Sequence, residues 1–136
     1  MPLHVELVSP EHILYEGEAD QVVCRPTGGE IAFLPGHQPF VGALVTYPVR
    51  ILLPGSGEVV AAVHGGFVEV RDDRVTVLSD VAELPEEIDV VRAQTAKESA
   101  AAAIAADPDD AEATAALARA ELRLSVAAGT SGSHGG

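Results

Sequence analysis

Three arginines and one aspartate are spaced so that they could meet at one end of a helical hairpin. Asp89 and Arg92 are three residues apart, and Arg119 and Arg123 are four apart, so each pair lies on one face of a helix. In an antiparallel pair of helices, the start of the first lies beside the end of the second, and the three guanidinium groups converge. Such a cluster could bind an anion, with Asp89 accepting a hydrogen bond from an amino group such as that of adenine.

The alternative is a set of surface ion pairs, Asp89 with Arg92 and Glu121 with a neighbour. Exposed pairs of this kind contribute about 0–1 kcal/mol each. Spacing alone favours this alternative over a ligand site.

Signatures of catalysis are absent from the sequence. It contains no GxxxxGK[ST], GxGxxG, GxSxG or HExxH motif, and no two of its five histidines have metal-ligand spacing on one helix. We therefore expect no catalytic residue and no metal ligand. A rival hypothesis is a freestanding small-molecule-binding β-barrel or a histidine-based enzyme, in which strands bring His4, His12 and His64 together in a cavity. Such a protein would act without a partner.

The composition limits the partners that the chain can have. Its 136 residues suit one domain, or a small domain with an appendage, and carry 21 acidic against 8 basic side chains, a net charge of -13. With a single lysine, Lys97, the chain is a poor match for nucleic acid or anionic lipid. The longest apolar run, residues 100–106, is far below the ~20 residues that span a bilayer. We expect a soluble intracellular protein without membrane insertion, in which the lone Cys24 is a buried hydrophobe.

Up to about residue 84 the sequence predicts β-structure. Apolar residues alternate with others, as in Leu3, Val5 and Leu7, and Gly- or Pro-containing turns recur every 8–12 residues. Gly65-Gly66 is interpreted as one such turn, and residues 71–74 as a tight hairpin turn. The pattern predicts an all-β sandwich or flattened barrel of about ten strands over residues 1–84.

From residue 85 the pattern becomes helical. Pro85 and the acidic residues after it predict a helix start, and the Ala-rich chain continues to Ala106 without Gly or Pro. Residues 107–110 break this helix, and a second is expected over residues 111–126. The prediction is an antiparallel αα-hairpin over residues 85–128, followed by a disordered tail over residues 129–136. The fold class is therefore α+β.

The hairpin is expected to be held weakly. An alanine side chain buries little apolar area, and burial contributes roughly 25 cal/mol per Å². A hairpin of this kind can detach and stay helical, as a conformational switch requires. The alternative is a simple Ala-rich helical pair, which composition alone favours.

Four sequence blocks resemble the epsilon subunits of the rotary F-type ATP synthase, over residues 1 to about 126. They are Gly29-Glu30-Ile31 with Leu34-Pro35-Gly36-His37-x-Pro39; Gly65-Gly66-Phe67-Val68-Glu69-Val70; Val75-Thr76-Val77-Leu78; and Ile88-Asp89-Val90-Val91-Arg92-Ala93. The family's β-sandwich and C-terminal helical hairpin agree with the architecture expected from the residue patterns.

The resemblance implies a non-catalytic subunit of the central stalk. The sandwich would bind the gamma subunit and the c ring, coupling proton flow to ATP synthesis at the cytoplasmic face of the bacterial plasma membrane. The loop Thr27, Gly28, Gly29 and Glu30 looks like the family's contact with the c ring. His37 lies in the segment near gamma and the ring, in a rigid turn that we expect to present its side chain outward. The hairpin would permit turnover when folded down, and would block ATP hydrolysis when extended along gamma into the alpha/beta hexamer.

The resemblance also implies a regulatory ATP, although no cofactor is required. Ile88, Asp89, Arg92 and Ala93 match a motif that binds ATP in some bacterial members and holds the hairpin down. Two further arginines, Arg119 and Arg123, look like the second-helix residues that join it. Glu83 is a weaker candidate.

Two departures from the family point to weak regulation. Ser99 stands where ATP-binding relatives carry a further arginine, and losing a charge-assisted phosphate contact should lower the affinity at least about tenfold. Inhibitory relatives have a basic second helix, whereas residues 111–126 carry two acidic and two basic side chains. We therefore expect inhibition of hydrolysis to be weak.

Overall fold

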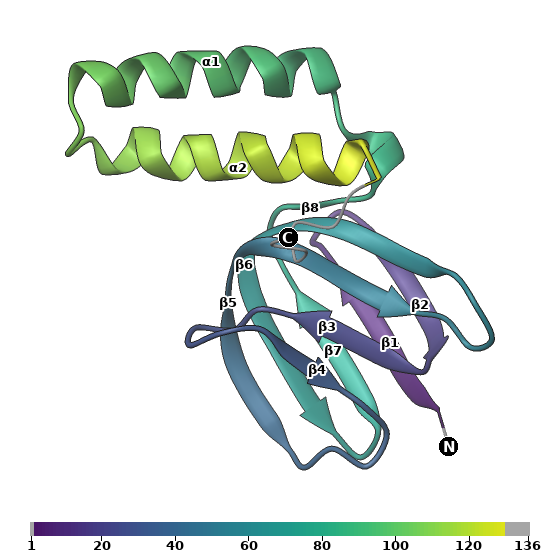
Figure 1. Cartoon of the computed structure of the whole chain (residues 1–136). Helices are drawn as coiled ribbons and strands as arrows, with labels where there is room; N and C mark the ends of the chain where they lie inside the picture. Colours follow the sequence, from purple (N-terminus) through teal and green to yellow (C-terminus); the bar gives the residue numbers. More distant parts are fainter. Residues whose placement is uncertain (1, 130–136) are drawn as a thin grey trace.

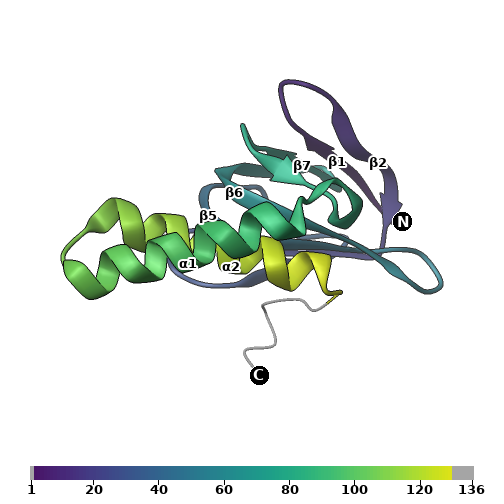
Figure 2. The same cartoon turned by 90° about the horizontal axis from the view of Figure 1, so that it is seen from above.

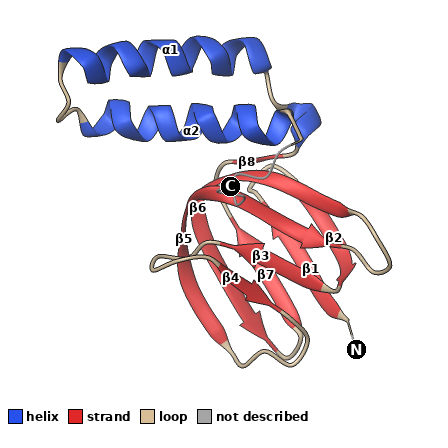
Figure 3. Ribbon diagram, in the orientation of Figure 1, coloured by secondary structure: helices blue, strands red, loops and turns tan. Residues whose placement is uncertain are grey.

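The computed structural model describes residues 2–129, which form a β-domain and a pair of helices (Figure 1). The predicted α+β architecture and helical hairpin are confirmed, with the helices in chain order after the strands (Figure 3). Except for Gly129, the tail predicted to be disordered lies outside the described residues. The strands are β1 (Leu3–Val8), β2 (Ile13–Ala19), β3 (Gln21–Cys24), β4 (Ile31–Phe33), β5 (Phe40–Leu52), β6 (Glu58–Arg71), β7 (Arg74–Leu78) and β8 (Ala82–Glu83). The helices are the 3-10 turn η1 (Pro85–Glu87), α1 (Val90–Ala106) and α2 (Ala111–Ala127).

The strands form one curled sheet in the order β2-β1-β7-β6-β5-β3-β4, with β8 added to β6. β1 and β7 are parallel, and the other neighbours are antiparallel. The sheet folds over its own inner face, as a sandwich does (Figure 1). The predicted alternation is confirmed, because Leu3, Val5 and Leu7 are fully buried while their neighbours in β1 face outward.

The core is aliphatic, with Phe33 as its largest fully buried side chain. Cys24 belongs to this core, and burial raises the pKa of its thiol to about 12. Cys24 is therefore the unreactive buried residue that the sequence predicts.

Eight strands are described rather than about ten, and the expected turn at Gly65-Gly66 is wrong. Both glycines lie inside the continuous strand β6, with φ of +86° and +119°. The register with β5 is the same on both sides of them, since Leu44 pairs with Gly66 and Thr46 with His64. Glycine permits this bend because it lacks a Cβ atom, so β6 curves across the sandwich instead of reversing.

The predicted hairpin turn over residues 71–74 is confirmed. Asp72 and Asp73 have φ of 52° and 60°, the left-handed conformations that a two-residue β-hairpin turn requires. The Asp73 carboxylate also accepts a hydrogen bond of 2.7 Å from the backbone of Gly36, which joins this turn to the β4–β5 loop.

The first helix begins later than the sequence predicts. Pro85–Glu87 form a separate 3-10 turn, Ile88 is extended, and α1 starts at Val90 with Asp89 as its N-cap. The interruption arises because Ile88 turns inward to be buried, while Asp89 accepts a hydrogen bond from the backbone of Arg92. The second helix matches its predicted range, and Asp110 caps it.

Figures 1 and 2 show the two helices side by side, with α2 between α1 and the β-domain. The buried residues of α1 are the small Ala93 and Ala100. As expected from the sequence, the helices approach each other through alanines.

We predict that Gly66→Ala destabilises the β-domain by more than about 2 kcal/mol, because the new Cβ would overlap the carbonyl group of Leu78 in the neighbouring strand. Urea unfolding followed by circular dichroism measures the change. Gly36→Ala is the matched control, since Gly36 also has positive φ but has open space around it. Gly36→Ala should lower the free energy of unfolding by only ~1 kcal/mol. Equal losses for the two variants would contradict the steric explanation.

Candidate functional site

The hairpin rests on the β-domain through a narrow apolar seam. Its buried members are Ala62 of β6, Ile88, and Leu122 and Val126 of α2. Val60 and Ala127 flank this cluster. Full burial of a branched aliphatic side chain contributes about 1.5–3 kcal/mol, so three such residues provide a modest hold.

A polar cluster lies beside the seam. The Glu83 carboxylate of β8 accepts a hydrogen bond of 2.7 Å from Arg123 Nε of α2 and one of 3.2 Å from His64 Nε2 of β6. The side chains of His64, Glu83 and Arg123 are 3%, 24% and 28% exposed. We call these three residues the junction triad. It joins the two parts of the chain through one shared carboxylate.

The pKa of His64 is lowered, chiefly by burial of the ring and then by the charge of Arg123. Arg119 acts in the same direction, whereas Glu83 favours the protonated ring. His64 Nδ1 is buried without a hydrogen-bond partner among the described residues. The docked structure therefore favours the neutral form of His64.

A hollow of about 430 Å³ opens next to the triad, where the two helices meet β8. Its lining residues come from both parts of the chain and are Glu83, Glu87, Asp89, Arg92, Ala93, Ala96 and Arg123. Two guanidinium groups thus share the hollow with three carboxylates. Arg123 is paired with Glu83, but Arg92 forms no ion pair with any described carboxylate, so its charge is available to a ligand.

The structure brings together most, but not all, of the residues that the sequence singled out. Asp89, Arg92, Arg123 and Glu83 line one hollow, and the anticipated ion pairs of Asp89 with Arg92 and of Glu121 with a neighbour are absent within residues 2–129. Arg119 does not line the hollow.

The expected convergence of three arginines is therefore wrong for Arg119. It turns to Glu112 of its own helix, with a distance of 2.9 Å between Nη2 and Oε1. Ile88 does not line the hollow either, because it is buried in the seam.

The histidine cavity of the rival hypothesis is not formed. His4, His12 and His64 contact three different carboxylates, those of Glu16, Glu87 and Glu83. Among the described residues, His4, Glu6 and Glu16 place possible metal-ligand atoms within 4.8 Å of one another. Glu6 already pairs with Arg74, so this group gives little support to a metal site.

The expected partner loops lie apart from the hairpin. Thr27–Glu30 connect β3 to β4, and the Glu30 carboxylate accepts a hydrogen bond of 3.0 Å from the Tyr47 hydroxyl. The turn that contains His37 lies at the end of the sandwich opposite the helices (Figure 1). The His37 ring, which the sequence predicts to point outward, is half-buried, because it packs edge-on against Phe33 at 4.8 Å while Nδ1 lies 2.7 Å from the Gln38 carbonyl.

An exposed apolar row on the outer face of the sheet was not predicted from the sequence. Strand pairing aligns one residue from each of five neighbouring strands, and these are Ala43, Phe67, Leu78, Val8 and Ile13. Phe67 and Leu78 are 59% and 52% exposed. The sequence did carry a signal for this row. A strand with one buried face needs apolar residues only at inward positions, yet Phe67 and Leu78 are apolar at outward positions.

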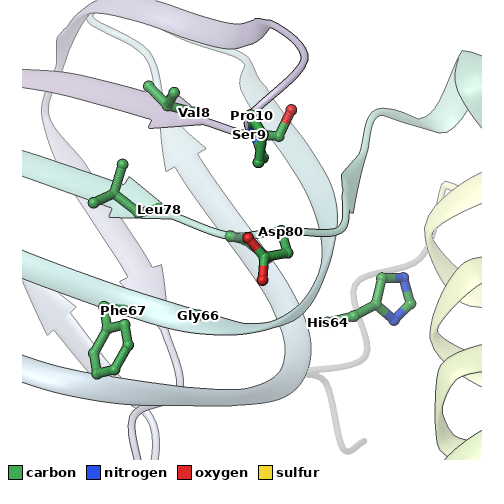
Figure 4. A pocket seen from close by; sticks show the side chains of 9 residues that line it. Val8, Ser9, Pro10, His64, Gly66, Phe67, Leu78 and Asp80 are labelled. Atoms are coloured by element: carbon green, nitrogen blue, oxygen red, sulfur yellow. The ribbon is translucent and has the colours of Figure 1, made fainter.

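A second hollow, of about 410 Å³, lies along this row. Its lining residues include Val8, Phe67 and Leu78, which project from three adjacent strands (Figure 4). The same view shows the His64 ring directed away from them, toward α2. The outer face thus offers a partner an apolar surface, whose hollow reaches the hairpin junction at His64.

Comparison with known proteins agrees with this architecture. A family model described as "ATP synthase, Delta/Epsilon chain, beta-sandwich domain" matches residues 2–85. The ATP synthase epsilon chain of Streptomyces griseus is 47% identical over 126 residues, covering 93% of this chain and 95% of its own. That of Thermobifida fusca is 48% identical over 128 residues, covering 92% and 91%.

Solved structures show the same fold. A chain of the Euglena gracilis mitochondrial ATP synthase, in a structure of OSCP, F1 and the c-ring, superposes with a TM-score of 0.77 at 25% identity, covering 89% of this chain and 78% of its own. A chain of the Tetrahymena thermophila mitochondrial ATP synthase central stalk and c-ring superposes with a TM-score of 0.51 at 17% identity, covering 64% and 69%.

A β-sandwich followed by a helical hairpin, with these relatives, defines a non-catalytic central-stalk subunit of an ATP synthase. The chain belongs to the family of ATP synthase epsilon chains. It is associated with a membrane as part of that complex. Within residues 2–129, no helix is both long and apolar enough to cross a bilayer.

We predict that Leu122→Ala lowers the free energy of hairpin opening by about 2–3 kcal/mol, because it removes the largest α2 side chain from the seam. Hydrogen exchange of α2 amides in the intact chain measures this opening. Val91→Ala is the control, since Val91 is 78% exposed on α1 and should leave exchange unchanged. An unaltered exchange rate in Leu122→Ala would show that the seam does not hold the hairpin.

Proposed function

We propose that the β-domain connects the rotor by binding the gamma subunit and the c ring, so that proton flow is coupled to ATP synthesis. The observation that carries the proposal is the exposed apolar row across β5, β6, β7, β1 and β2. Contiguous exposed apolar surface is characteristic of protein interfaces. We assign the gamma subunit to this face, and the complex to the cytoplasmic face of the bacterial plasma membrane.

We assign the c ring to the loop Thr27–Glu30 and the His37 turn. Gly28 and Gly29 have positive φ, and nothing lies within 4 Å of a Cβ built on either residue. The backbone of this loop is therefore accessible to a partner. The exposed acidic Glu30 and the fixed ring of His37 supply polar contacts at the periphery of such an interface.

The hairpin is the regulatory part, and ATP is its ligand. The hollow at the hairpin base is lined by Glu83 of β8, Asp89 at the start of α1, Arg92 of α1 and Arg123 of α2, so a bound molecule would bridge the two parts of the chain. Arg92 is free to pair with phosphate, and Ala93 and Ala96 leave space beside it. A ligand that binds only the docked state stabilises it by about 2.7 kcal/mol at a hundredfold excess over Kd. That is comparable with the contribution of one buried branched side chain in the apolar seam.

Regulation by this hairpin is weak. Glu83, Glu87 and Asp89 place negative charge around the hollow, and Ser99 contributes no cation to it. When extended into the alpha/beta hexamer, α2 brings equal numbers of acidic and basic side chains, Glu112 and Glu121 against Arg119 and Arg123. Electrostatic attraction to acidic catalytic subunits is then small, and so is the inhibition of ATP hydrolysis.

We predict that Phe67→Glu weakens binding to the purified gamma subunit at least about tenfold, because it places a charge in the centre of the apolar row. Surface plasmon resonance or co-purification measures the affinity. Val91→Glu introduces the same charge at an exposed valine of α1 and should leave the affinity for gamma unchanged. If both variants bind gamma equally well, the row is not the gamma interface.

We predict that full-length protein binds ATP in calorimetry, that Arg92→Ala lowers the affinity about tenfold or more, and that Ser99→Arg raises it by a similar factor. Arg71→Ala is the control, because Arg71 is exposed beside the β6–β7 turn and does not line the hollow. No detectable heat with either the parent or Ser99→Arg would refute the nucleotide site.

A further inference from the structure

The junction triad is complete only when the hairpin is docked. His64 and Glu83 belong to the β-domain, whereas Arg123 belongs to α2. Departure of the hairpin removes Arg123 and uncovers the His64 ring, whose side chain is 3% exposed in the docked structure. The surroundings of one titratable ring therefore differ between the two positions of the hairpin.

Protonation of His64 is incompatible with the docked arrangement. Nε2 donates to Glu83, so a second proton would go to Nδ1, which is buried and faces no acceptor among the described residues. A buried N–H group without a partner and a cation beside Arg123 both raise the free energy of the docked state.

The charged groups around the ring come from three elements. From α2, Arg123 and Arg119 disfavour protonation, and from β8 Glu83 favours it. Asp80 lies in the segment before β8 and, like His64, contributes to the hollow along the apolar row. Glu87 of η1 bonds to His12 and to the backbone of Leu84. Glu83, the carboxylate that favours the protonated ring, is thus already paired with Arg123 and offers less stabilisation to a charged His64.

We propose that His64 is a pH sensor that releases the hairpin when its ring becomes protonated. The proposal rests on the mobile regulatory hairpin proposed above, and adds a control that needs no nucleotide.

The lowered pKa of His64 determines whether docking strengthens or weakens as the pH falls. The docked state lowers the pKa of His64, by burial and by Arg123, whereas a water-exposed ring in the released state titrates near its ordinary value of about 6.5. Docking is therefore strongest above about pH 6.5 and weakens as the pH falls below it. Between about pH 7.5 and about pH 5.5, the ratio of docked to released chain should fall by up to about tenfold.

The test measures accessibility of a cysteine placed in the seam of the full-length chain. Val126→Cys puts a thiol at a position that is 1% exposed when the hairpin is docked. Its rate of reaction with a pyridyl disulfide reports release. Cys24, buried in the sandwich with a pKa of about 12, is the internal reference for unfolding of the β-domain.

Variants in the Val126→Cys background are compared at the same pH, so that the intrinsic reactivity of the thiol cancels. His64→Gln keeps a donor for Glu83 but does not titrate. His4→Gln is the matched control, because His4 lies on β1 and contacts Glu16. We expect relative protection to fall up to about tenfold on acidification in the parent and in His4→Gln, and to stay constant in His64→Gln. The same fall in His64→Gln, or none in the parent, would overturn the proposal.

Arg123→Gln keeps the sensor testable if His64→Gln itself loosens the hairpin. It leaves His64 beside Glu83 without the neighbouring guanidinium cation, so the fall on acidification should shrink. A fall as large as in the parent would overturn the proposal.

Leu122→Ala distinguishes failure of the sensor from failure of the mobile hairpin. If this variant exposes the thiol introduced at position 126 while the parent shows no pH response, the hairpin moves and only the sensor is wrong. If that thiol stays equally protected in both proteins at every pH, the hairpin does not leave, and the regulatory function proposed above fails as well.

Discussion

Attachment of the hairpin depends on one carboxylate that two parts of the chain share. Glu83 accepts hydrogen bonds from Arg123 of α2 and from His64 of β6. Because charge-assisted hydrogen bonds are strong when partly buried, and because a buried group left unpaired is costly, this arrangement favours one docked position over others. The apolar seam beside it supplies the remaining hold, but is too small to make the docking irreversible.

The composition of the hairpin suits an element that must be both ordered and detachable. Alanine has the highest helix propensity, so α1 and α2 keep their conformation with little help from the β-domain. The helices bury Ala93, Ala100, Ala113 and Ala120, small side chains that allow close approach but contribute little burial energy. The aliphatic sandwich, by contrast, has a continuous core built mainly of larger side chains.

Much of the site was predictable because it depends on local spacing. Asp89 and Arg92 lie together by helical geometry, and two antiparallel helices bring Arg123 near them. Arg119 could not be placed in this way, since spacing alone does not specify that its side chain pairs with Glu112, seven residues earlier on the same helix. Nor could His64 be linked to Glu83, because this contact requires the pairing of β8 with β6, which the sequence pattern does not specify.

The sequence by itself determined the class of the fold, the boundary near residue 85 and the family, since period-two alternation, alanine content and four short sequence blocks are all local features. Only the tertiary structure decided that Gly65-Gly66 bend a continuous strand, that five outward side chains align into one apolar row, and that His64 and Arg123 share Glu83. Each of these depends on the register between strands or on the packing of α2. Contacts between residues far apart in the chain are selected by the free energy of the whole fold, not by local propensity.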